Sequence, residues 1–169
     1  MFLARVLTGR DLRDRKVLDI GTGSGILALV VARTGADVTA VDINATAVEC
    51  ARANVARNGV MNHVRVLRSD VFDALTASDR FDLIVSNPPF YDRAVRSDAD
   101  RAFATGPDNE FFRRVAADLA SRLVPGGSLI LVHSSDAAWE PIECLFQEAG
   151  FAPALVDRRR RVFLSLIHI

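Results

Sequence analysis

The segment of this sequence with the clearest capacity for chemistry is Asn87-Pro88-Pro89-Phe90, which follows the largely apolar run 81–86. The Asn87 side-chain oxygen and the Pro88 carbonyl oxygen can accept both N–H groups of an amide or an exocyclic amine, a nitrogen whose delocalised lone pair is a poor nucleophile. Two consecutive prolines fix φ and remove backbone donors, so these acceptors would be held rigidly. Phe90 offers a flat face on which a planar amide or base can stack. We predict that these four residues act catalytically on a planar nitrogen; the alternative is an ordinary turn that ends a strand.

A glycine-rich turn, residues 19–25, follows another short apolar run. Its missing side chains allow a tight strand-to-helix turn and let a ligand approach the backbone closely. A dinucleotide fingerprint would need a glycine at the position of Ile26, so the compact Gly-x-Gly-x-Gly pattern favours a nucleoside that carries an amino acid. Asp19 is placed to hold the ammonium group of such a ligand, directly or through water. The expected ligand contacts in this turn are Asp19, Gly21, Thr22, Gly23 and Gly25.

Two further carboxylates close the next strand patterns. Asp42 is placed to accept hydrogen bonds from both hydroxyls of a ribose, and Asp70 from an adenine amine. Either aspartate alone could be a helix N-cap or a loop acid, but the carboxyl ends of parallel strands meet at one edge of a sheet. The expected lining of that edge, beside the glycine turn, is Asp42, Ile43, Asn44, Asp70, Val71 and Asn87.

Strand and helix patterns alternate along the chain, which predicts an α/β fold with a seven-stranded, doubly wound, mostly parallel sheet and a C-terminal antiparallel strand. The expected strands are 16–20, 37–41, 64–68, 82–86, 128–133, 151–156 and 162–169, the last two forming an antiparallel pair. The expected helices are 2–8, 26–34, 45–58, 109–124 and 137–149. A long polar segment, 91–107, separates the fourth strand from the next helix and is expected to act as a lid.

The composition bounds the class of protein. The chain has 169 residues, 50% of them apolar, and predicts one domain spanning residues 1–169. No apolar run is long enough to cross a bilayer and the N-terminus does not fit a secretory signal, so we expect a cytoplasmic protein without membrane association. The formal net charge of zero argues against strong non-specific affinity for nucleic acid.

The cysteines, the histidines and one basic run give three further expectations. Cys50 and Cys144 have no partner spacing and are expected as free core cysteines. The three histidines are scattered and form no metal-binding pattern, so no metal is expected. The basic run Arg158–Arg161 is expected either as a solvated hairpin turn or as a contact for a phosphate or an acidic partner.

Over about residues 3–169, the chain resembles class I S-adenosylmethionine (SAM)-dependent methyltransferases through the segments DIGTGSG, VDIN, SD, SNPPF and LVPGGSLILV. The NPPF segment is similar to that of the nitrogen-methylating branch, which includes HemK-like glutamine methyltransferases, adenine methyltransferases and small-domain ribosomal RNA guanine methyltransferases. Residues 104–114 are similar to a HemK-like stretch. The resemblance implies SAM as cofactor and favours a protein glutamine as methyl acceptor. The implied partners are a protein substrate such as a translation release factor, and a small activating subunit.

Two other functions stay open. A nucleic-acid methyltransferase acting on the exocyclic amine of adenine or guanine in RNA or DNA is favoured by Arg93, Arg96, Arg101 and the run Arg158–Arg161, and opposed by the zero net charge. A SAM-binding partner subunit without catalysis is disfavoured by the intact Asn-Pro-Pro-Phe segment. HemK-like enzymes of bacteria usually carry a helical N-terminal domain, whereas residues 1–15 alone precede the first strand here, so we expect a minimal, single-domain relative.

Overall fold

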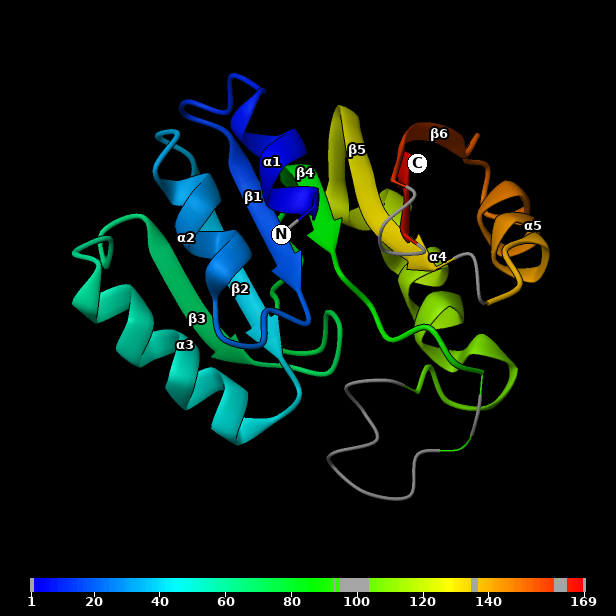
Figure 1. Cartoon of the computed structure of the whole chain (residues 1–169), viewed down its shortest axis with the longest axis horizontal. Helices are drawn as coiled ribbons and strands as arrows, with labels where there is room; N and C mark the ends of the chain where they lie inside the picture. The colour runs from blue at the N-terminus through cyan, green and yellow to red at the C-terminus, as the bar shows by residue number, and fades with distance from the viewer. Residues whose placement is uncertain (1, 93, 95–103, 135–136, 160–163, 169) are drawn as a thin grey trace.

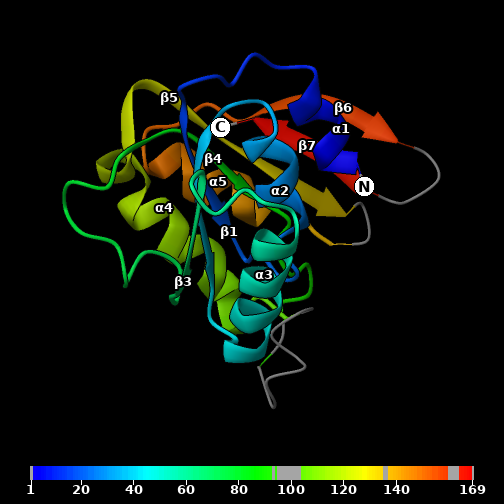
Figure 2. The ribbon, with the colours of Figure 1, turned by 90° about the vertical axis from the view of Figure 1, so that its left-hand side faces the viewer.

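The strands form a twisted sheet with helices on both faces (Figure 1, Figure 2). The computed structural model describes residues 2–92, 94, 104–134, 137–159 and 164–168. The strands are β1 (Lys16–Ile20), β2 (Asp37–Asp42), β3 (Val64–Arg68), β4 (Phe81–Ser86), β5 (Leu123–Ser134), β6 (Ala154–Arg159) and β7 (Leu164–His168). The helices are α1 (Phe2–Thr8), α2 (Ile26–Ala32), α3 (Ala45–Arg57), α4 (Glu110–Arg122) and α5 (Glu140–Glu148), with a 3-10 turn, η2 (Pro107–Asn109), before α4.

The order of strands across the sheet is β3-β2-β1-β4-β5-β7-β6. The first five of these are parallel, which confirms the expected α/β fold with a parallel sheet. At the other edge β7 pairs antiparallel with β5, and β6 antiparallel with β7. The chain runs from β1 through β2 to β3 on one side and then crosses from β3 to β4 on the other side of β1, so the direction of winding reverses at β1. Such a reversal opens a crevice outside the carboxyl ends of the strands, where ligands bind in open α/β sheets.

Alternation along the strands divides the core into two layers. In β4, Leu83 and Val85 pack with residues of α1, α2 and α3, whereas Ile84 packs with residues of α4 and α5. α4 supplies its layer at helical spacing, burying Phe112, Val115, Ala116 and Leu119. Both faces of the parallel strands are therefore covered, as a parallel sheet requires.

The largest difference from the expected elements lies where α4 gives way to β5. The helix pattern was expected to run through Val124, but α4 ends at Arg122 and β5 begins at Leu123. Leu123 pairs with Phe81, and the register then shifts before Leu83. A Cβ on Gly127 would lie 2.9 Å from the Phe81 carbonyl oxygen, so the two backbones approach more closely here than a side chain permits.

Other expectations have mixed outcomes. Cys50 and Cys144 are free, but both are exposed rather than in the core, because they lie off the buried faces of α3 and α5. Arg158 and Arg159, expected in a hairpin turn, lie at the end of β6, which extends to Arg159. Arg93, Arg96, Arg101, Arg160 and Arg161, and most of the expected lid, lie outside the described residues.

The search for membrane spans and metal sites covers the described ranges only. None of the helices there combines the length and the hydropathy needed to cross a membrane. Within the same ranges, no three His, Cys, Asp or Glu side chains are grouped so that they could hold a metal ion.

Candidate functional site

A cavity of about 310 Å³ lies outside the carboxyl ends of β1 to β4, which point toward the lower half of Figure 1. The predicted residues that line it are Gly21, Gly23, Asp42, Ile43, Asn44, Asp70, Val71, Asn87 and Pro89. The two motifs that carry the chemistry, far apart in the sequence, thus meet in one cavity at the crevice that the strand order creates.

The glycine turn presents bare backbone to this cavity. Gly21 and Gly23 have φ values of 71° and 56°, which glycine adopts readily and other residues rarely do. A Cβ built on either would meet nothing within 4 Å. The backbone N–H groups of Gly21 and Thr22 donate to the Val41 carbonyl oxygen at 2.9 and 3.0 Å, which fixes the turn against the end of β2. The open space beside both glycines is therefore available to a ligand.

Gly25 serves a different purpose from the one expected. It does not line the cavity; a Cβ at this position would lie 3.2 Å from the Ala51 Cβ. With a φ of 81° it is the N-cap of α2 and lets this helix start close against α3.

Asp19 lies behind the turn and not on the cavity lining. Its side chain is fully buried, and the Thr22 hydroxyl donates to Oδ2 at 2.7 Å. Among the described residues, Oδ1 has no hydrogen-bond partner of ordinary geometry. Burial raises the pKa of Asp19 to about 6, although the hydrogen bond from Thr22 favours the charged form. Asp19 therefore keeps one oxygen without such a partner, on a side chain that solvent does not reach.

Asp42 is locked in place by two backbone donors. The Gly23 N–H donates to Oδ2 at 2.8 Å and the Asn44 N–H donates to Oδ1 at 2.9 Å. Each carboxylate oxygen keeps a further lone pair, so both can still accept from a ligand hydroxyl. Asn44 also caps α3, since its side-chain oxygen accepts from the Thr46 N–H at 2.9 Å.

Asp70 has a partner that the sequence analysis did not foresee. Its carboxylate forms an ion pair with Arg114 of α4, and Arg114 also pairs with Asp73 at 2.9 Å. Both Asp70 and Arg114 line the cavity. The next residue, Val71, has a φ of 51°, a strained conformation for a β-branched side chain.

The Asn-Pro-Pro-Phe segment lies partly on the cavity. Asn87 is exposed to it and Pro89 lines it, whereas Pro88 is buried and does not. Phe90 does not line it either; its ring meets His133 edge to face, with centroids 6.4 Å apart. The Ser86 hydroxyl donates to the Ile20 carbonyl oxygen at 2.9 Å, which ties this segment to the start of the glycine turn.

A further part of the cavity lining comes from the segment 104–114, which in the sequence stood out only by its resemblance to a family. The lining residues missed there are Ala104, Thr105, Gly106, Glu110, Phe111 and Arg114. The Thr105 N–H donates to the Tyr91 carbonyl oxygen at 2.9 Å, which returns the chain to the end of the Asn-Pro-Pro-Phe segment. Gly106 has a φ of 83°, and a Cβ there would lie 2.7 Å from a Glu110 carboxylate oxygen. That glycine was the available signal for a tight, ligand-facing turn.

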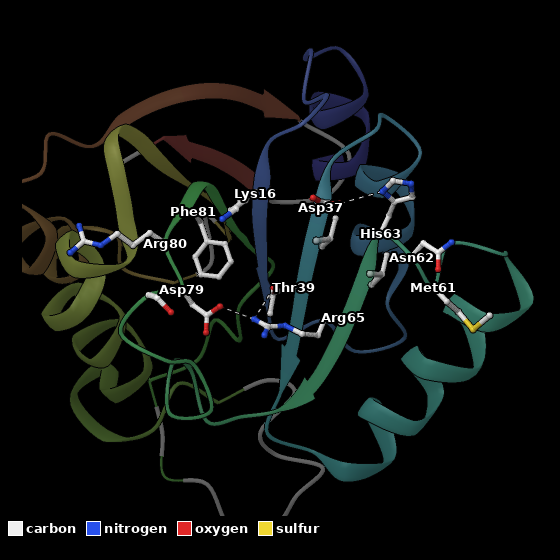
Figure 3. Close-up of a pocket in the computed structure, with 13 residues that line it drawn as sticks. Lys16, Asp37, Thr39, Met61, Asn62, His63, Arg65, Asp79, Arg80 and Phe81 are labelled. Carbon is white, nitrogen blue, oxygen red and sulfur yellow. Dashed lines mark hydrogen bonds and ion pairs between the residues drawn. The ribbon is translucent and has the colours of Figure 1, made fainter.

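A second cavity, of about 520 Å³, lies at the amino ends of β1, β2 and β3 (Figure 3). Its charged groups are largely satisfied by one another: Arg65 pairs with Asp79 at 2.9 Å, and His63 lies 3.3 Å from Asp37. It contains none of the predicted site residues. The smaller cavity, which joins both motifs, is the candidate functional site.

The sequence of this chain is similar to those of known methyltransferases. A relative from Bordetella pertussis, named release factor glutamine methyltransferase, is 40% identical over 146 residues, covering 80% of this chain and 53% of the relative. The ribosomal RNA small subunit methyltransferase C of Chromohalobacter salexigens is 38% identical over 157 residues, covering 92% of this chain and 42% of the relative. The chain spans about half the length of these curated relatives.

A solved structure agrees with the sequence relatives. The 16S rRNA N2 G1207 methyltransferase of T. thermophilus, in complex with AdoMet and guanosine, has a TM-score of 0.72 and 33% identity over 98% of this chain and 40% of that one. The sequence model described as "methyltransferase small domain" matches residues 1–153. The expected class of SAM-dependent methyltransferase domain is confirmed, and the chain belongs to the methyltransferase small domain family.

Proposed function

We propose that this chain transfers a methyl group from SAM to a planar nitrogen. The observation that carries the proposal is that the glycine turn, Asp42, Asn87 and Pro89 line one cavity. A cofactor site and an acceptor site in one cavity are what direct transfer between two bound molecules requires.

The chain's own groups fit SAM. The open space beside Gly21 and Gly23 suits a ligand held close to the backbone. The two oxygens of Asp42 have lone pairs for the ribose hydroxyls, and the unsatisfied Oδ1 of Asp19 suits an ammonium group, directly or through water. Asp70 and the Val71 N–H are proposed to hold the adenine edge. When bound, SAM supplies a methyl group activated by its sulfonium.

Asn87 and Pro88 are proposed to hold the acceptor. The Asn87 side-chain oxygen and the Pro88 carbonyl oxygen would accept the two N–H groups of the incoming nitrogen and orient its lone pair. Pro89 has no backbone N–H, so it cannot compete with the substrate for either acceptor oxygen. Phe90 would support this segment through its contact with His133 and present its remaining face to a planar group.

The acceptor that we propose is a protein glutamine side chain, in a partner of the release-factor kind. Two observations favour it: the relative that is 40% identical is named for this activity, and the segment 104–114, with its HemK-like pattern, lines the same cavity as Asn87. A second candidate is the exocyclic amine of guanine, which the T. thermophilus structure with guanosine favours.

The test is transfer of a radiolabelled methyl group from SAM to two separate pools, release-factor protein and ribosomal RNA. Label in the protein, lost when the glutamine is replaced by asparagine, supports the first candidate; label in the RNA supports the second. The same assay with Asn87→Ala tests the acceptor site. Its control is Asn62→Ala, which removes an exposed amide at the other end of the sheet. Label in neither pool, from protein that binds SAM, would contradict both acceptors.

A further inference from the structure

The turn 69–74, which carries Asp70 into the cavity, is held in a strained shape. Val71 occupies the left-handed region with a φ of 51°. The Ser69 hydroxyl donates to the Val71 carbonyl oxygen at 3.0 Å and accepts from the Ala74 N–H at 3.0 Å. The side chain of Val71 is buried in the layer of α4 and α5. Packing and the Ser69 hydroxyl therefore fix the backbone of this turn, but neither fixes the carboxylate of Asp70.

Arg114 supplies the missing constraint on that carboxylate. From α4 its guanidinium pairs with Asp70 Oδ2, with Asp73 at 2.9 Å, and reaches the Asp70 carbonyl oxygen at 3.4 Å. The planar fork of an arginine can hold several acceptors of one turn at once, which a lysine ammonium does less rigidly. The ion pair leaves Asp70 Oδ1 with its lone pairs for another donor.

The pair is poorly placed to act as a stability device. The side chains of Arg114 and Asp70 are 35% and 41% exposed, and ion pairs that solvent reaches contribute little to folding. Both residues instead line the cavity. Their arrangement therefore bears on what the cavity binds more than on whether the chain folds.

We infer that Arg114 is a positioning residue that holds Asp70 as an acceptor for the adenine amine and thereby sets the selectivity of the site for adenine over other bases. This inference rests on the proposed function, in which Asp70 faces adenine. A hypoxanthine base in its place carries a carbonyl oxygen where adenine carries its amine, so a fixed carboxylate would meet a second acceptor and repel it. If Asp70 could rotate away, the site would lose both the attraction and the repulsion.

The experiment measures the dissociation constants of S-adenosylhomocysteine and S-inosylhomocysteine by calorimetry. For the native chain we expect adenine to be preferred by about 100-fold, on the scale for leaving one polar contact of a site unpaired. Arg114→Met should reduce this ratio about tenfold, and Arg114→Lys should give an intermediate ratio. Arg113→Met is the matched control, because Arg113 is exposed on the same helix and does not line the cavity.

Asp70→Asn tests whether Arg114 acts through the carboxylate of Asp70. It should reduce the preference for adenine to what the Val71 N–H alone provides, and adding Arg114→Met to it should change the ratio no further, since the arginine acts through the carboxylate. Thermal unfolding of each variant shows whether it folds, and Arg114→Lys keeps the test available if Arg114→Met does not.

The outcomes separate this inference from the proposal beneath it. No binding of S-adenosylhomocysteine by the native chain would overturn the proposed function and the inference together. Binding without preference for adenine would overturn the role of Asp70. A preference for adenine that survives in folded Arg114→Met and Arg114→Lys would overturn the inference alone.

Discussion

The backbone N–H of Gly23 donates a hydrogen bond of 2.8 Å to the carboxylate of Asp42, which joins the turn after β1 to the end of β2. The two motifs were expected to contact one ligand, and the structure shows that they also contact each other. A change at Asp42 therefore alters the conformation of the glycine turn as well as the acceptor that the ribose would use.

Asp42→Ala is expected to weaken SAM binding about 30- to 1,000-fold, the range for losing the acceptor of two charge-assisted hydrogen bonds. Asp42→Asn keeps one side-chain acceptor, so its affinity for SAM should lie between those of the native chain and Asp42→Ala. The measurement is calorimetry with SAM, and Asp37→Ala, at the exposed far end of the same strand, is the control. An unchanged dissociation constant in Asp42→Ala would exclude Asp42 from the cofactor site.

Two glycines allow backbone strain to be separated from ligand contact. Gly23 and Gly59 both have positive φ, and a Cβ on either would meet nothing within 4 Å. Alanine at either position should cost about 1 kcal/mol of folding free energy, because both must adopt the left-handed conformation. Only Gly23→Ala should also reduce SAM affinity, since only its Cβ would enter the cavity. Equal SAM affinity in the two variants, each shown to fold by circular dichroism, would mean that no ligand approaches the turn.

The raised pKa of Asp19 predicts that the free energy of unfolding depends on pH. Its folded pKa of about 6 lies above the unfolded value near 3.9, so the fold favours the neutral carboxyl. The resulting stabilisation is fully present below pH 4 and is lost as the pH rises through 6. Asp19→Asn mimics the neutral form, so its stability relative to the native chain should rise by about 2 kcal/mol between pH 4 and pH 8. Urea unfolding at several pH values measures the difference, and a difference independent of pH would contradict the raised pKa.

The same group should make SAM binding depend on pH. A ligand ammonium near Asp19 favours the charged carboxylate, so the affinity of the native chain should increase from pH 5 to pH 7. In Asp19→Asn this increase should disappear. An identical increase in both would assign the pH dependence to another group.

The parts of the site that were predictable are those that local sequence determines. Gly21, Gly23 and Asp42 follow directly from the strand ends and the positive φ that the turn requires. The role of Gly25 was not predictable, because it depends on the approach of Ala51 from another helix. The ion pair of Arg114 with Asp70 likewise depends on how α4 packs across the turn after β3.

The same reasoning applies to the fold. The central strands were predictable because they are short, almost continuously buried apolar runs, whereas the start of β5 depends on a register shift against β4 that no local pattern encodes. The exposure of Cys50 and Cys144 follows from which face of each helix meets the sheet, and this is settled only by packing.

Asn87 allows the sharpest test of the proposed chemistry. Its role is to hold an N–H of the acceptor and orient the lone pair, so it contributes to the reaction and little to cofactor affinity. Asn87→Ala should lower turnover by about 10²–10³, the scale for one preorganised polar contact, while the dissociation constant for SAM changes little. The proton can leave after transfer, so no neighbouring base needs to act together with Asn87.

Asn87→Asp separates the acceptor role from size and shape. The carboxylate keeps two acceptor oxygens in nearly the same volume but places a negative charge in the cavity, so activity between those of the native chain and Asn87→Ala would support hydrogen-bond acceptance. Single-turnover rates with saturating SAM measure this step without the binding contribution. Full activity in Asn87→Ala would reduce the Asn-Pro-Pro-Phe segment to a turn at the end of β4, and the proposed methyl transfer would lose the residue on which its acceptor site depends.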